Sequence, residues 1–350
     1  MSVPLRAVQL TEPSEFLKEH PEVQFVDLLI ADMNGVVRGK RIERNSLPKV
    51  FEKGINLPAS LFALDITGST VESTGLGLDI GDADRICYPI PGTLSMEPWQ
   101  KRPTAQLLMT MHELEGDPFF ADPREVLRQV VARFTEMELT IVAAFELEFY
   151  LIDQENVNGR PQPPRSPISG KRPQSVQVYS IDDLDEYVEC LQDIIDGARA
   201  QGIPADAIVA ESAPAQFEVN LNHVNDALKA CDHAVLLKRL VKNIAYDHEM
   251  DTTFMAKPYP GQAGNGLHVH ISLLDKHGNN IFTSEDPDTA ASVRSSTCRT
   301  RRAGAWTTAP WPCACPPAAR TRYAWNTAWP APTPTPTCYW QRCWPAFITG

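Results

Sequence analysis

The sequence lacks the features that would mark a membrane protein, a secreted protein or a nucleic-acid-binding protein. It has no run of about 18 apolar residues that could span a membrane, and no basic amphipathic segment that would lie on one. Its first residues, MSVPLRAVQLTEPSEF, contain no apolar stretch like that of a signal peptide. The formal net charge of −12 disfavours binding to phosphate backbones. We therefore expect a cytoplasmic protein with neither a membrane nor a nucleic-acid partner.

Cysteine is scarce in the first 288 residues, where only Cys87, Cys190 and Cys231 occur. Their wide spacing and the length of the chain argue against a disulfide scaffold, so we interpret them as buried or inert thiols. With 350 residues, of which 43% are hydrophobic, the chain can form about two domains with sizeable cores.

The composition changes abruptly at Thr289. Residues 289–350 contain no Asp, Glu, Lys, Leu, Met or His, although they hold six of the seven tryptophans and five of the eight cysteines. A disordered Pro-rich tail would avoid Trp and Cys. A zinc-binding tail would need a wider spacing than that of Cys313 and Cys315. We favour a third interpretation, a frameshift in a GC-rich gene.

A shift of the reading frame by one base gives this segment an amino-acid sequence typical of a folded protein. Residues 306–316, WTTAPWPCACP, can then read LDNRTVALRVP, and residues 323–329 can read VRLEHRV. Residues 333–350 can read DANPYLLLAAVLAGIHHG, which has the leucines and the apolar pattern of a helix. We therefore interpret 289–350 as an aberrant, out-of-frame tail.

The first 288 residues predict mixed helices and strands. FVDLLIADMNGVVRGKRI indicates two strands joined at Asn34–Gly35, after a short helix that begins near Thr11. After about residue 105, strands alternate with long helices. The expected helices cover 123–137, 182–200 and 224–249, and the expected strands cover 140–152, 216–221 and 266–274.

Three of these strands alternate polar with apolar residues, so that each places its polar side chains on one face. These polar residues are Glu146 and Glu148, then Glu218 and Asn220, then His268, His270 and Ser272, with Glu211 just before the second strand. Crowded carboxylates repel each other, and a divalent cation removes that repulsion. Mg²⁺ or Mn²⁺ prefers such oxygen ligands. The pattern predicts a metal site, and the alternative is three solvated strand faces.

The order and spacing of ELE (146–148), ESAPAQFE (211–218) and KPYPGQAGNGLHVHIS (257–272) resemble the glutamine synthetase family. The glycines in the last motif let the backbone approach a ligand closely. DMNGVVRGKRI and RICYPIPGTLSMEPWQKRPTAQLL are most similar to the γ-glutamylpolyamine synthetase branch. The sequence encoded in the shifted frame adds NRTVALRVP and RLEHR, which are also similar to motifs of the family.

The resemblance implies an α+β fold, with an N-terminal β-grasp-like domain over 1–105 and a catalytic domain with a curved antiparallel sheet over 106–288. It implies ATP and two to three Mg²⁺ or Mn²⁺ ions as cofactors. It also implies a homo-oligomeric ring with sites between neighbouring subunits. In the family, ATP phosphorylates the side chain of glutamate, and an amine then displaces phosphate to form an amide. The implied partners are therefore glutamate, ATP and an amine.

The motifs also imply roles for single residues. Glu148, Glu211 and Glu218 would hold one metal ion, and Glu146 and His268 would hold the second. Gly264 would contact the substrate glutamate. The candidates for nucleotide binding are His270, Ser272, Asp206 and His223. No catalytic base is assigned, because the flap that carries it in the family has no counterpart after Asp288.

Two departures from the family pattern bear on function. Where ammonia-using members carry an Asp before a Gly-Ser-Ser-like loop, this chain has Thr67 in TGST; Asp65 is two residues away, and Asp84 in DADR can match a second acid of the family. This favours a larger amine, such as a polyamine. The arginines and the last metal-binding Glu of the family fall in the shifted text, so we expect the chain as written to be inactive.

Three alternatives stay open. The first is an ordinary glutamine synthetase that uses ammonia. The second is a non-catalytic ATP- or metal-binding subunit of an oligomer, and the third is a metal-dependent hydrolase. The GNGLHVHIS loop argues against the last of these.

Overall fold

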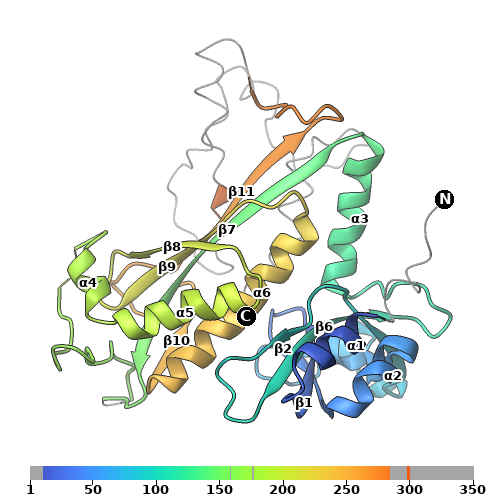
Figure 1. Cartoon of the computed structure of the whole chain (residues 1–350), viewed down its shortest axis with the longest axis horizontal. Coiled ribbons are helices and arrows are strands. Elements are labelled where there is room, and N and C mark those ends of the chain that lie inside the picture. The colour runs from blue at the N-terminus through green and yellow to red at the C-terminus, as the bar shows by residue number, and fades with distance from the viewer. Residues whose placement is uncertain (1–10, 158, 176, 284–297, 300–350) are drawn as a thin grey trace.

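The computed structural model describes residues 11–157, 159–175, 177–283 and 298–299. The predicted tail, 289–350, therefore lies outside the described residues except for 298–299. Two six-stranded sheets lie next to each other, and helices cover one face of the sheet that contains β7 (Figure 1). In the described part of the chain, no helix is both long enough and apolar enough to span a bilayer. The observed class is α+β, as predicted.

The first sheet has the strand order β2-β1-β6-β4-β3, with β5 paired to β6. Its strands are β1 (Phe25–Ala31), β2 (Val37–Glu43), β3 (Ile55–Pro58), β4 (Asp84–Pro89), β5 (Ser95–Met96) and β6 (Thr104–His112). Beside them are α1 (Glu12–Glu19), α2 (Leu47–Lys53) and the short 3-10 helices η1 (Arg44–Ser46), η2 (Ala59–Ala63), η3 (Glu72–Thr74) and η4 (Leu78–Ile80). Strands β1 and β6 are parallel. Because β6 lies inside this sheet, the sheet extends past residue 105, and the domain boundary there stays a prediction.

The second sheet has the order β12-β11-β7-β9-β8, with β10 paired to β7. Its strands are β7 (Thr140–Asp153), β8 (Ala205–Ala210), β9 (Gln216–Leu221), β10 (Met250–Thr253), β11 (Leu267–Leu274) and β12 (Cys298–Arg299). All of these pairs are antiparallel. The helices of this part are α3 (Pro123–Glu136), α4 (Ile181–Asp185), α5 (Val188–Ala200) and α6 (Ala227–Asp247). The antiparallel sheet agrees with the expectation for a catalytic domain.

Short-range hydrogen bonds account for the predicted hairpin and for helix α3. In the β1–β2 turn, Asp32 Oδ1 accepts hydrogen bonds from the backbone N–H of Asn34 (2.8 Å) and of Val36 (2.9 Å). Gly35 takes the positive φ of 70° that this turn requires. Asp122 caps α3, because its side chain accepts from Arg124 N at 2.8 Å. Both predicted elements are confirmed.

Two helices differ from the sequence-based expectation, and a third begins where expected but lacks its side-chain cap. Residues 182–200 form two helices, α4 and α5, because Tyr187 breaks the helical path between them and its buried hydroxyl donates to Pro164 O at 2.9 Å. Helix α6 begins after Asp226, which caps it, because Val224 instead pairs with Ala143 in an isolated bridge. Thr11 precedes α1 but makes no capping hydrogen bond through its side chain.

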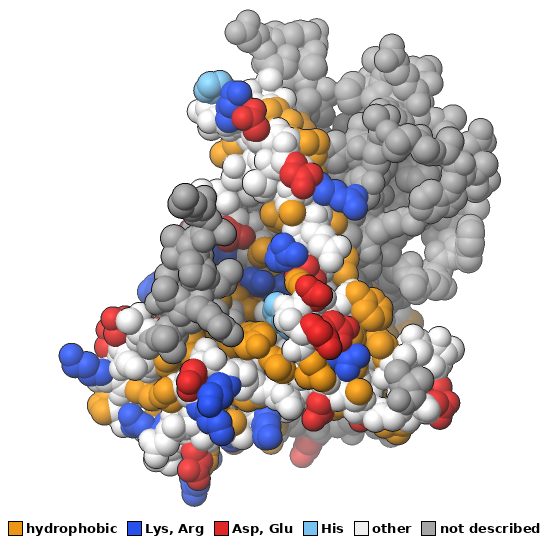
Figure 2. Space-filling view, turned by 90° about the vertical axis from the view of Figure 1, so that its right-hand side faces the viewer, with side chains coloured by type: hydrophobic (Ala, Val, Ile, Leu, Met, Phe, Trp, Pro, Cys, Tyr) orange, Lys and Arg blue, Asp and Glu red, His pale blue; other side chains and the backbone are white. Residues whose placement is uncertain are grey.

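Two hydrophobic cores hold these elements. The larger one lies between the second sheet and helices α5 and α6, which cross one face of it (Figure 1). Phe145 and Phe149 of β7 and Leu237 of α6 are fully buried there. The smaller core lies on the first sheet, around Leu28 and Leu107. Acidic, basic and hydrophobic side chains are interspersed over the face seen in Figure 2, so the net negative charge does not gather in one patch on it.

Two arginines on helices form buried ion pairs, and one of them, Arg239, connects the second part of the chain to the first sheet. Arg124 at the start of α3 donates from Nε and Nη2 to both oxygens of Asp232 on α6, each at 2.9 Å. Arg239 of α6 reaches the first sheet, where its Nη2 lies 2.6 Å from Glu97 Oε1 and 3.2 Å from Asp27 Oδ2. Helix α6 is therefore fixed to the apolar face of one sheet and to the charged residues of the other.

Removing Asp232 should destabilise the fold strongly, because Arg124 would keep its charge in a buried place without a partner. Asp232→Ala should lower the free energy of unfolding by about 3–5 kcal/mol. Asp196→Ala is the matched control, because it removes the exposed Arg199–Asp196 pair and should cost no more than about 1 kcal/mol. Urea unfolding followed by circular dichroism measures both, and equal losses would contradict the role assigned to the buried pair.

Candidate metal centre

The polar faces of strands β7, β9 and β11 converge because the three strands are neighbours. Strand β7 lies between the other two, and its register places Glu146 opposite His268 and Glu148 opposite Glu218. The alternate side chains of β7 point into the larger core; these are Phe145, Leu147 and Phe149, all of them buried. Burial of this apolar set leaves the acidic set on the opposite face. The predicted adjacency of the three strands is confirmed.

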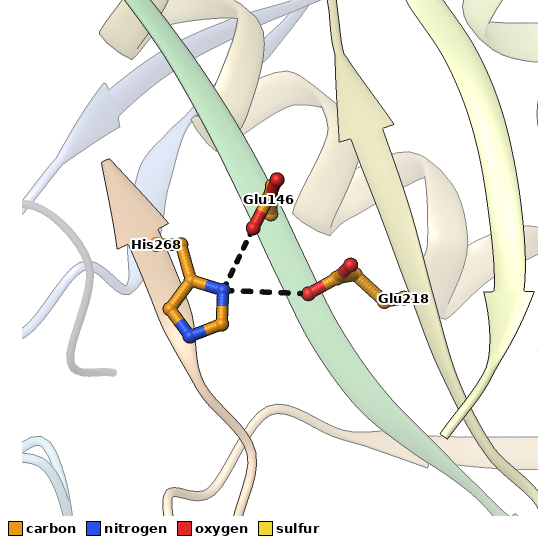
Figure 3. A group of neighbouring side chains, drawn as sticks. All are labelled: Glu146, Glu218 and His268. Carbon is orange, nitrogen blue, oxygen red and sulfur yellow. Dashed lines mark hydrogen bonds and ion pairs between the residues drawn. The ribbon is translucent and has the colours of Figure 1, made fainter. Parts of the chain in front are cut away.

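Glu146, Glu218 and His268 form the first group of side chains that could hold a cation (Figure 3). Each comes from a different strand, and all three point to one space between the strands. His268 Nδ1 lies 2.7 Å from Glu146 Oε2 and 3.5 Å from Glu218 Oε2. One nitrogen and two carboxylate groups thus approach as closely as the ligands of a single ion.

Glu148, Glu211 and Glu218 form the second group, in which one oxygen of each carboxylate lies within 4.8 Å of the others. Glu211 follows β8, and its backbone N–H donates to Gln216 O at 2.8 Å across the turn that leads into β9. Because Glu218 belongs to both groups, two cations bound here would be neighbours. These are the five residues that the motifs single out, although their role as ligands stays a prediction.

The second group carries negative charge that its neighbours compensate only in part. Burial, followed by the charges of Glu211 and Glu218, raises the pKa of Glu148 above its usual range. Burial and the charge of Glu218 likewise raise the pKa of Glu211. These carboxylates are therefore harder to ionise than carboxylates in water, and a divalent cation would remove that penalty.

In the first group, histidine supplies the positive charge. Hydrogen bonds with Glu218 and Glu146, against the effect of burial, raise the pKa of His268 to about 9. Burial would raise the pKa of Glu146, but the hydrogen bond with His268 and the charge of His270 lower it overall. His268 therefore carries a proton at neutral pH, and a metal ion that binds its ring nitrogen must displace that proton.

His270 lies beside Glu146, and the ring of His223 lies next to that of His270. His270 Nε2 is 2.9 Å from Glu146 Oε1, and the rings of His270 and His223 are 6.0 Å apart. The structure thus brings two of the four predicted nucleotide candidates to the edge of the acidic cluster. Ser272 is further along β11, opposite Val142. Asp206 is exposed at a bulge in β8, between Ala205 and Ala207.

The glycine-rich loop approaches the carboxylates so closely that it leaves no room for larger residues. A Cβ on Gly266 would lie 2.5 Å from Glu148 Oε1 and 2.9 Å from His268 Nε2. A Cβ on Gly264 would lie 2.5 Å from Ala256 O. The backbone therefore forms one wall of the site. Gly264 is required because a Cβ there would clash with backbone, whereas a Cβ at Gly266 would displace the side chains of Glu148 and His268.

Three amide side chains hold this arrangement, and the motifs did not single them out as site residues. Gln216 Nε2 donates to Glu148 Oε2 at 3.1 Å, and Asn220 Nδ2 donates to Glu218 Oε1 at 3.1 Å. Asn265 Nδ2 donates to the carbonyl oxygens of Thr253 and Met255, each at 3.0 Å. The alternation of Gln216, Glu218 and Asn220 along β9 was the available signal.

The donor set suits a hard divalent cation. Four carboxylates and one imidazole converge from three strands and one turn, and Mg²⁺ or Mn²⁺ prefers such oxygen-rich ligands. Two cations at these groups would be close enough to contact one phosphate chain together. The arrangement is therefore suited to chemistry on a phosphorylated substrate.

Sequence comparisons point the same way. The family described as "Glutamine synthetase, catalytic domain" matches residues 120–319. The chain is 45% identical over 276 residues to gamma-glutamylputrescine synthetase PuuA of Escherichia coli (strain K12), which covers 79% of this chain and 58% of that protein. It is 31% identical over 290 residues to glutamate–isopropylamine ligase of Pseudomonas sp, covering 81% of this chain and 62% of that protein. The chain thus spans about three fifths of the length of these relatives.

Solved structures share the fold. The ADP complex of GmaS superposes with a TM-score of 0.66 at 26% identity, over 78% of this chain and 58% of that one. Plasmodium falciparum glutamine synthetase superposes with a TM-score of 0.65 at 20% identity, over 83% of this chain and 57% of that one. The match of the family over residues 120–319, together with the fold and the acidic cluster, shows that the chain belongs to the glutamine synthetase family.

Proposed function

We propose that this chain descends from an ATP-dependent ligase that joins glutamate to an amine through γ-glutamyl phosphate. The observation that carries the proposal is the convergence of Glu146, Glu148, Glu211, Glu218 and His268 into two overlapping groups. Bound Mg²⁺ or Mn²⁺ would neutralise the phosphates of ATP. The carboxylates would fix the ions, and the loop at Gly264 would orient the substrate glutamate.

A polyamine-like amine is the proposed acceptor. The identity of 45% with a gamma-glutamylputrescine synthetase supports it. The loop at Thr67 supports it as well, because Asp65 Oδ1 accepts hydrogen bonds from Thr67 N (2.8 Å), Thr67 Oγ1 (2.7 Å) and Ser69 N (2.9 Å). The Asp65 carboxylate therefore stabilises its own turn and is poorly placed to deprotonate ammonium.

The chain as written is proposed to lack ligase activity. Its shifted text, after Asp288, replaces the arginines and the last glutamate that the family uses. The same feature favours one alternative, a non-catalytic subunit that keeps a cation site. Ordinary glutamine synthetase stays the same-class alternative, and the ring oligomer and the nucleotide roles of Asp206, His223, His270 and Ser272 stay predictions.

Cation binding tests the site directly. Glu148→Gln or Glu211→Gln should weaken Mn²⁺ binding by at least about tenfold, because mutation of a residue that only hydrogen-bonds to a metal ligand already lowers metal affinity by about 10–100-fold. Binding should also weaken as the pH falls, beginning above pH 4.5, because the pKa values of Glu148 and Glu211 are raised and protons compete with the ion. Titration calorimetry measures both effects. Glu138→Gln is the control, since Glu138 is exposed and pairs with Lys276; a loss equal to that of Glu148→Gln would rule out the assigned ligands.

Amine preference tests the proposed acceptor. A version with the reading frame and the flap restored should show a higher kcat/KM for a diamine such as putrescine than for ammonia. Thr67→Asp should move that preference toward ammonia, because it adds an acid that can take a proton from ammonium. Phosphate release with glutamate, ATP and a panel of amines measures the ratio. Higher specificity for ammonia than for every diamine tested would favour ordinary glutamine synthetase.

The tail itself is tested by comparing the chain as written with the restored version. Glutamate-dependent ATP turnover should be lower in the chain as written by roughly 10³–10⁵, the effect of losing a phosphate-stabilising arginine in other phosphoryl-transfer enzymes. Its solubility should also be lower, because Thr, Pro and Trp replace a leucine-rich segment that would cover the catalytic sheet. Comparable turnover in the two proteins would show that 289–350 is a functional variant.

A further inference from the structure

The side-chain amide of Gln216 connects the acidic cluster to the glycine-rich loop. Its Nε2 lies 3.1 Å from each of three acceptors: Glu148 Oε2, Gly264 O and Asn265 Oδ1. Gln216 is 1% exposed, so water does not take part freely in these contacts. One buried group thus touches both a carboxylate of the cation site and the loop beside it.

These contacts cannot all be satisfied at once. An amide nitrogen carries two N–H groups, so the three acceptors compete for two hydrogens. The orientation of the amide is fixed, since its other end, Oε1, is buried without a partner among the described residues and turning the group would face an oxygen toward three acceptors. Asn265 cannot relieve the competition, because its Nδ2 donates to Thr253 O and Met255 O.

The charge of Glu148 decides which of the three acceptors receive the two N–H groups of Gln216. A carboxylate accepts hydrogen bonds more strongly than a neutral carbonyl does, so Glu148 draws one N–H away from the loop when no cation is present. A cation that binds Glu148 takes over part of that negative charge. Both N–H groups are then available to Gly264 O and Asn265 Oδ1, and the loop is held more firmly.

We propose that Gln216 is a positioning residue that couples occupation of the Glu148–Glu211–Glu218 cation site to the conformation of the loop around Gly264. The inference rests on the proposed function, in which this loop orients glutamate. By linkage, a ligand that fixes the loop then strengthens cation binding by the same factor. The backbone of Gln216, which holds Glu211 N through its carbonyl, is untouched by a change of side chain.

Hydrogen exchange of the loop, with Mn²⁺ as the probe, tests the coupling in the full chain. In the parent protein, saturating Mn²⁺ should slow amide exchange over residues 256–266 by roughly fivefold or more, the lower end of coupling between sites. In Gln216→Leu, Mn²⁺ should still bind through the three glutamates, but loop exchange should be fast and no longer respond to Mn²⁺. Calorimetry on the same samples reports the binding separately.

Two variants guard against a loss of fold. Gln216→Met keeps the length of the side chain but has neither an N–H nor an added oxygen, so it should still bind Mn²⁺ and show no protection of the loop. Gln201→Leu removes a matched glutamine whose Nε2 donates to Met96 O at 3.0 Å, and it should behave like the parent.

Three outcomes would overturn the coupling. They are equal Mn²⁺-dependent protection in Gln216→Leu and the parent, bound Mn²⁺ without any protection in the parent, and no Mn²⁺ binding in the parent. Only the last of these also removes the proposed cation site, so failure of the coupling and failure of the proposed function are told apart.

Discussion

Repulsion between carboxylates crowded on one sheet face is the constraint on which the second domain depends. Glu148, Glu211 and Glu218 stay close because the opposite side chains of β7 and β9 are buried in the larger core, and burial of that apolar surface outweighs the local repulsion. His268 relieves part of the repulsion as a protonated ring. The same strands therefore carry the repelling carboxylates on one face and the apolar side chains that stabilise the core on the other.

A second layer of contacts prevents the carboxylates from turning away from each other. Gln216 and Asn220 donate to Glu148 and Glu218, and the absence of a side chain at Gly266 allows the loop to approach both Glu148 and His268. Helix α6 adds a third constraint, because Arg239 fixes it to Asp27 of the first sheet and to Glu97, which follows β5. The acidic cluster is thus preorganised by neutral donors and by distant ion pairs.

Local chemistry made several elements predictable. The β1–β2 hairpin follows from Asp32, Asn34 and Gly35, and α3 follows from Asp122 and Pro123, because capping and turn hydrogen bonds span only a few residues. The split between α4 and α5 was not predictable in this way. It depends on the bond from Tyr187 to Pro164, which comes from a segment 23 residues away in the chain.

The sequence by itself determined which side chains share a face, since alternation along a strand fixes that without any partner. It therefore determined that Glu146 and Glu148 lie together, as do His268 and His270. Only the tertiary structure decided that β7 lies between β9 and β11, which residues stand opposite each other, and that Gln216 reaches the loop at Gly264. Strand order and register depend on packing between distant segments, and a one-residue slip would reverse every face.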